Sequence, residues 1–202
     1  YGIPAAGTKM APFFTGLHNA DSITIDAHKW LFVPKSCSLL LVRDLTSLSD
    51  TFSHEEAYMP HDEKKPNPVD FTLEYSRPLR ALKLWLAFKT HGADAFRNAI
   101  EFNIELAQMT YRIALEHPEF NVLPYAPELS IVPLQYAPSG RSDISWLNAT
   151  LCKKLIADGR FYISPAQIDG QTWLRPCFTN FRTTKDDVHA LFKVIVELGR
   201  EF

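Results

Sequence analysis

Residues 21–42 read DSITIDAHKWLFVPKSCSLLLV and place Lys29 within a stretch that is rich in apolar side chains. Isoleucines alternate with polar residues over 22–26, which is the pattern of a short strand. Residues 37–43, CSLLLVR, form a continuous apolar run that is typical of a buried strand. We therefore expect two strands joined by a turn. Lys29 would lie just beyond the end of the first strand, where sheet proteins often carry functional groups.

The apolar neighbours of Lys29 raise a question about its chemistry. An ammonium next to Trp30, Leu31 and Phe32 is costly to desolvate unless it is paired, neutralised or covalently modified. We expect these neighbours to disfavour the charged form and so make the amine a nucleophile. Such amines form imines with aldehydes, including pyridoxal phosphate. Spacing alone favours the alternative, a lysine that extends past the apolar run into solvent.

The bulk composition excludes several classes of function. The 202 residues carry a net charge of −2 and include 46% hydrophobic and 22% charged residues, so no basic surplus predicts nucleic-acid binding. Cys37, Cys152 and Cys177 are too far apart for a disulfide framework or a paired-cysteine metal site, which favours a cytoplasmic location. No apolar run approaches the roughly 20 residues of a membrane helix. Because the sequence opens at Tyr1 without methionine, we interpret it as the latter part of a longer polypeptide.

The middle of the chain predicts a loop followed by helices. Residues 53–70, SHEEAYMPHDEKKPNPVD, are too polar and too rich in proline for regular structure, so we expect a long mobile loop. A helix with an apolar stripe that begins at Leu79 should start near Pro78. His91–Gly92 interrupts its pattern.

The remainder of the chain predicts a second domain of mixed helix and sheet. Apolar periodicity indicates helices and strands in the order helix, strand, strand, helix, strand, strand, helix. The turn of the second strand pair should fall at Asp169–Gly170. The last helix should open with a capping box at Thr184 and Asp187. Helices are expected over 94–116, through 144–155 with Gly159 closing the helix, and from 184 onward. Strands are expected over 120–123, 130–136, 160–166 and 171–178.

Three ordered blocks give the sequence a family resemblance. Residues 21–44, with the triplet HKW, resemble the active-site segment of the group II pyridoxal-phosphate decarboxylases, which include the aromatic-L-amino-acid, tyrosine, histidine and glutamate decarboxylases. The resemblance continues through YSRPLRALKLWLAFKTHG (75–92) and WLRPCFTNFRTTKDDVHAL (173–191). It implies an α/β protein of the aspartate-aminotransferase-like fold (fold type I). Residues 1–92 would form the C-terminal part of the cofactor-binding large domain, and 93–202 the small α+β domain.

The resemblance also implies roles for individual residues. Lys29 would hold pyridoxal 5'-phosphate as an internal aldimine. His28 would lie beside the cofactor phosphate, although a structural histidine is an equal alternative, and Asp26 matches a position near that phosphate. Arg175 would bind the substrate α-carboxylate, a task that suits bidentate guanidinium pairing; the alternative is an arginine in a surface ion pair.

The implied reaction is the decarboxylation of an L-amino acid to an amine and carbon dioxide. In the family, a tyrosine on a mobile loop is implicated in protonating the α-carbon. Here Tyr58 is the only tyrosine of the 53–70 loop, whereas counting back from RALK places the family position near Pro68. Gaps in the alignment are an equal explanation of this difference, with Tyr58 or His54 as the donor. A relative without this tyrosine can act as an aldehyde synthase, which decarboxylates and oxidatively deaminates.

The resemblance further implies that most of the cofactor cradle precedes Tyr1. The family aspartate that pairs with the pyridine nitrogen, the phosphate-binding turn and the stacked histidine all have upstream positions. A truncated, non-catalytic fragment is therefore a third hypothesis beside the decarboxylase and the aldehyde synthase. Family sites form at a dimer interface, so we expect a homodimer. The sequence does not define which amino acid is the substrate.

Overall fold

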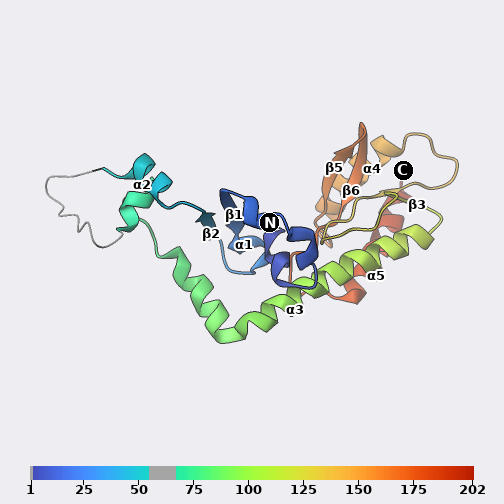
Figure 1. Ribbon diagram of the computed structural model, residues 1–202. Helices are drawn as coiled ribbons and strands as arrows, with labels where there is room; N and C mark the ends of the chain where they lie inside the picture. The colour runs from blue at the N-terminus through green and yellow to red at the C-terminus, as the bar shows by residue number, and fades with distance from the viewer. Residues whose placement is uncertain (1, 55–66) are drawn as a thin grey trace.

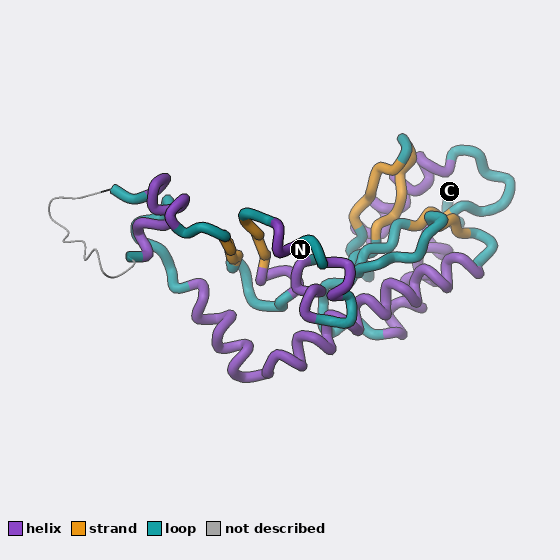
Figure 2. The backbone as a smooth tube through the Cα atoms, in the orientation of Figure 1, coloured by secondary structure: helices purple, strands orange, loops and turns teal. Residues whose placement is uncertain are grey.

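A bent helix, α3 (Arg80–Glu116), connects the two folded parts of the chain (Figure 1). The computed structural model describes residues 2–54 and 67–202. A two-stranded sheet and several short helical turns lie along the middle of α3, and a four-stranded sheet with two more helices lies toward its C-terminal end (Figures 1 and 2). The mixed helix and sheet confirm the expected α/β class.

Three short 3₁₀ helices open the chain, and the first packs on α3. They span Ile3–Gly7, Ala11–Phe14 and Leu17–Asn19, and the first two carry a proline in their first turn, where a missing N–H costs nothing. Ala5 and Met10 are buried in a cluster with residues of α3. The sequence analysis predicted no helices here.

The stretch that opened the sequence analysis folds into a hairpin-like unit. Strands β1 (Ser22–Asp26) and β2 (Ser38–Val42) pair antiparallel, with Asp26 opposite Ser38. A single helical turn, α1 (Ala27–Trp30), begins directly after β1. Both predicted strands are present, and Lys29 does lie just beyond the end of the first. The expectation that the second strand is buried is wrong, because Leu40 is 53% exposed and Leu41 is 50% exposed.

The predicted loop is described only at its two ends. A short helix that the sequence analysis did not predict, α2 (Thr46–Phe52), precedes it. A 3₁₀ turn, Pro68–Phe71, lies within its last residues. Most of the residues that we expected to be mobile, 55–66, lie outside the described ranges.

Helix α3 bends at Gly92. That residue has φ 75°, a left-handed value that glycine adopts without a side-chain clash. The predicted interruption at His91–Gly92 is therefore confirmed. The first arm of the helix and the residue before it leave large apolar side chains in solvent: Leu79 is 72% exposed and Trp85 is 58% exposed. The predicted domain boundary between residues 92 and 93 falls at this bend and stays a prediction.

The C-terminal part is a four-stranded antiparallel sheet in the order β3-β4-β6-β5. Asp169 and Gly170 both have positive φ, at 51° and 73°, as a two-residue type I′ hairpin turn requires. Three predicted strand ranges differ from the structure: residues 160–163 do not join the sheet, the strand predicted over 171–178 ends at Arg175, and the one predicted over 130–136 begins only at Leu134. The strands are β3 (Phe120–Val122), β4 (Leu134–Tyr136), β5 (Ser164–Ile168) and β6 (Gln171–Arg175).

The main hydrophobic core lies between this sheet and three helices. Helices α4 (Ile144–Asp158) and α5 (Lys185–Gly199) bury apolar faces together with the second arm of α3. The capping box predicted for α5 is present, since Thr184 N–H donates to Asp187 Oδ2 at 2.8 Å and Asp187 N–H donates to Thr184 Oγ1 at 3.3 Å. The predicted inner face of α5 is buried: Val188, Leu191, Phe192, Ile195 and Leu198.

Two kinds of feature are absent from the described residues. No helix among them is both long enough and apolar enough to cross a membrane. Within residues 2–54 and 67–202, no group of three or more histidine, cysteine, aspartate or glutamate side chains is arranged to hold a metal ion.

Candidate active site

Lys29 forms an ion pair with the last residue of β1. Its Nζ lies 2.5 Å from Asp26 Oδ2, and Ser38 on the facing strand donates to Asp26 Oδ1 at 2.6 Å. The hydrogen bond from Lys29, and next the one from Ser38, lower the pKa of Asp26 to about 2. The carboxylate is therefore ionised at neutral pH and links the lysine to the sheet.

The expectation that apolar neighbours desolvate Lys29 is wrong. Its side chain is 52% exposed, whereas Trp30 is 0% exposed and donates through Nε1 to Asn103 Oδ1 at 3.0 Å. Successive residues of a helical turn point about 100° apart. Trp30 and Val33 therefore enter two different apolar clusters while Lys29 points outward.

His28 is anchored to the start of β2. Its ring Nδ1 lies 2.9 Å from the carbonyl oxygen of Cys37, and its backbone N–H donates to the same oxygen at 3.1 Å. These contacts orient the ring and support the structural alternative. The predicted phosphate contact stays a prediction.

Arg175 lies at the end of β6 in the C-terminal sheet. Its Nη2 donates to Ser164 Oγ at 2.8 Å, and none of the ion pairs among the described residues involves it. Because side chains alternate along a strand, Arg175 faces away from Leu174, which is buried in the core under α4 and α5. The described contacts do not join Arg175 to Lys29, which belongs to the other sheet.

Only one of the two candidate proton donors lies among the described residues. Tyr58 lies outside the described residues. The alternative, His54, is described: its ring packs against Tyr75 with centroids 5.3 Å apart, and its Nδ1 lies 3.1 Å from the carbonyl oxygen of Phe52.

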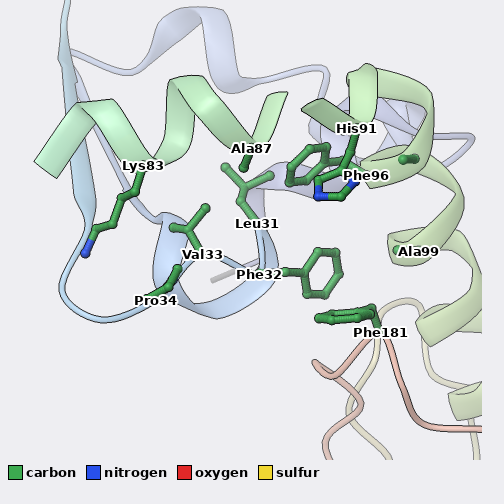
Figure 3. A pocket seen from close by; sticks show the side chains of 11 residues that line it. Leu31, Phe32, Val33, Pro34, Lys83, Ala87, His91, Phe96, Ala99 and Phe181 are labelled. Atoms are coloured by element: carbon green, nitrogen blue, oxygen red, sulfur yellow. The ribbon is translucent and has the colours of Figure 1, made fainter. Parts of the chain in front are cut away.

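A pocket of about 390 Å³ lies beside α1, on the inner side of the α3 bend (Figure 3). It is lined by residues 31–34, which directly follow the Lys29 turn, by both arms of α3, and by Phe181. Neither Lys29 nor Arg175 lines it. Sequence analysis missed this feature, although Lys83, Ala87 and His91 follow the four-residue spacing that places side chains on one helical face.

The comparisons with known proteins identify the class. Residues 6–136 match the family described as the pyridoxal-dependent decarboxylase conserved domain. This match covers more than half of the chain, and the chain therefore belongs to the pyridoxal-dependent decarboxylase family.

Two kinds of enzyme occur among the similar proteins. The chain is 34% identical to an aromatic-L-amino-acid decarboxylase of Bacillus atrophaeus over 209 residues, which cover 100% of this chain and 43% of that protein. It is 28% identical to a 3,4-dihydroxyphenylacetaldehyde synthase of Drosophila melanogaster, with 86% of this chain and 34% of that protein covered. The chain thus spans less than half the length of these relatives.

The fold agrees with solved structures. The crystal structure of Oryza sativa TDC with PLP and tryptamine matches with a TM-score of 0.90 at 20% identity, covering 100% of this chain and 43% of that one. This similarity confirms the expected fold and shows that the described elements correspond to part of a larger fold.

Proposed function

We propose that this chain contributes the lysine and the carboxylate-binding arginine of an enzyme that decarboxylates an L-amino acid, with pyridoxal phosphate as cofactor. The observation that carries the proposal is the position of Lys29, whose exposed side chain extends from the helical turn at the end of β1 in a chain of this family. The products would be an amine and carbon dioxide.

The residues present fit the aldehyde end of pyridoxal phosphate. Bond formation to an aldehyde needs an amine that a small molecule can reach, and the Lys29 side chain is 52% exposed. His28 is fixed through Nδ1, and its other ring nitrogen would contact the phosphate. When bound, pyridoxal phosphate supplies an electron sink for cleavage of a bond to the α-carbon.

The side chains of this chain would divide the work of binding and orientation. Asp26 pairs with Nζ of Lys29, and Ser38 fixes the carboxylate that does so. This ion pair favours the protonated ammonium, so Lys29 would have to lose a proton and leave Asp26 before it could bond to an aldehyde. Arg175 would bind the substrate carboxylate through the guanidinium N–H groups that Ser164 leaves available. Orientation of that carboxylate would decide which bond breaks.

Borohydride reduction followed by peptide mapping tests the assignment. The full chain is incubated with pyridoxal phosphate and reduced, and we expect the pyridoxyl label on Lys29. Lys29→Ala should abolish specific labelling, while Lys35→Ala, at an exposed lysine of the same connection, should not. A label spread over surface lysines, or absent from Lys29, would refute the proposal.

An aldehyde synthase is the second candidate. The similarity to a 3,4-dihydroxyphenylacetaldehyde synthase favours it, and so does the uncertain match of Tyr58 to the family tyrosine. Its reaction consumes oxygen and releases hydrogen peroxide, whereas simple decarboxylation does neither. Turnover without oxygen uptake would eliminate this candidate.

A third candidate is a non-catalytic fragment, which the short span relative to the relatives favours. Cofactor titration of the chain separates it from the other two, because tight binding with turnover excludes it.

A cytoplasmic homodimer also stays our prediction. The three free cysteines and the exposed Leu79 and Trp85 support it, and light scattering measures the assembly.

A further inference from the structure

We propose that the pocket inside the α3 bend binds a small aromatic carboxylic acid, at a site separate from Lys29. The pocket of about 390 Å³ falls within the usual size of small-molecule sites. It exists because Gly92 bends the helix, so that both arms of α3 and the turn after Lys29 enclose one space (Figures 1 and 3).

The walls select an aromatic body. Phe32 stacks with Phe96 at 6.4 Å between ring centroids and meets Phe181 edge-on at 5.7 Å. Ala87 on the first arm of α3 and Ala95 and Ala99 on the second arm also line the pocket, and their small side chains leave room for a flat ring. A ring held here gains the aromatic contacts that stabilise such clusters.

The polar groups of the lining select a negative charge. Lys83 and His91 both line the pocket, and none of the eleven lining residues is acidic. Figure 3 shows Lys83 at the edge of the lining, with its ammonium directed away from the Phe32 and Phe181 rings, and His91 beside the Phe96 ring. Lys83 can pair with a carboxylate, and a histidine ring offers an N–H donor in either protonation state. An ammonium in the same place would meet only like charge or apolar surface.

The positive side chains of the lining should bind an acid more tightly than an amine of the same shape. We therefore choose 4-phenylbutyrate and 4-phenylbutylamine, which share one carbon skeleton and differ in the sign of the charged group. Binding to the full chain is followed by calorimetry and by methyl and amide NMR shifts. We expect the acid to bind and to shift signals of Leu31, Val33, Ala87 and Ala95, and the amine to bind at least fivefold more weakly.

Variants locate the site. Lys83→Gln should weaken acid binding about two- to fivefold, the range for one partly exposed charge. Lys89→Gln, on the same helix but beside Trp85 instead of the pocket, should leave it unchanged. Ala87→Phe should fill the space and weaken binding at least tenfold. Ala95→Leu provides a second filling variant, and thermal melting confirms that each variant folds.

Three results would overturn the proposal. Equal affinity for the acid and the amine would refute the charge selection. Unchanged binding in a folded Ala87→Phe or Ala95→Leu variant would place the ligand elsewhere. Intermolecular NMR contacts to the lining methyl groups would show that a second copy of the chain occupies the pocket. Because none of these readouts uses pyridoxal phosphate, the result is independent of the function proposed above.

Discussion

The Asp26 carboxylate holds Lys29 in place, with no help from burial. It accepts hydrogen bonds from Lys29 at 2.5 Å and from Ser38 at 2.6 Å, so one side chain ties the helical turn to both strands of the hairpin. The composition around Lys29 predicted an apolar environment. It could not predict the direction of each side chain, because a single turn distributes consecutive residues over different sides. A partner three residues before the lysine was visible in the sequence, but as a candidate phosphate neighbour.

We predict that Lys29→Met raises the pKa of Asp26 from about 2 toward its ordinary value of 3.8. Because the folded pKa is the lower one, the ion pair stabilises the fold above about pH 4, and this contribution is lost as pH falls from about 4 to about 2. Carbon NMR of the Asp26 side chain measures the titration. The melting-temperature difference between wild type and variant should be constant above pH 4 and shrink below it.

Lys35→Met is the matched control for this titration, since Lys35 is an exposed lysine in the same connection. It should leave the midpoint of Asp26 unchanged. An Asp26 midpoint near 3.8 in the wild-type chain would contradict the ion pair.

At the scale of elements, the sequence patterns correctly predicted the features that a few adjacent residues determine. The capping box at Thr184, the turn at Asp169–Gly170 and the bend at Gly92 each depend on a few adjacent residues. Helix α2 was missed because its sequence, TSLSDTF, consists mostly of residues that favour caps and turns over helices. Its first turn is held instead by Asp44, which accepts from the backbone N–H of Thr46 at 2.9 Å.

We predict that Asn148→Ala destabilises the C-terminal part by about 2–4 kcal/mol. The buried Asn148 accepts from the backbone N–H of Tyr136 at 2.9 Å and donates to the carbonyls of Tyr136 and Ile144 at 2.9 and 2.8 Å. Removal of the amide leaves buried backbone groups of β4 without partners. Urea unfolding measures the loss. Lys153→Ala, at an exposed position of the same helix, should change stability by less than about 0.5 kcal/mol.

For the whole molecule, the proposed function requires that two separate sheets keep a fixed relation. Lys29 follows β1 and Arg175 ends β6, and no described contact joins these two side chains. A buried amide provides an indirect connection. Asn103, on the second arm of α3, accepts from Trp30 Nε1 at 3.0 Å and donates to the carbonyl of Asn180 at 3.1 Å. It thus connects the residue after Lys29 to the segment that follows β6. Sequence analysis could not find this connection, because its partners lie 73 and 77 residues away from it.

We predict that Asn103→Leu loosens both sides of this connection at once. The substitution keeps the branched shape of the side chain, with larger methyl groups, but removes both hydrogen bonds, leaving the buried indole N–H and the Asn180 carbonyl without this partner, at a cost of about 1–3 kcal/mol. Hydrogen exchange should become faster in α1 and in residues 178–182, while the centre of α4 keeps its protection. Trp30→Phe should reproduce the effect at α1 with a smaller change near Asn180, since the second hydrogen bond remains. Equal loss of protection across the whole chain in both variants would instead indicate global destabilisation, and Asn103 would then have no specific role in joining the two sheets.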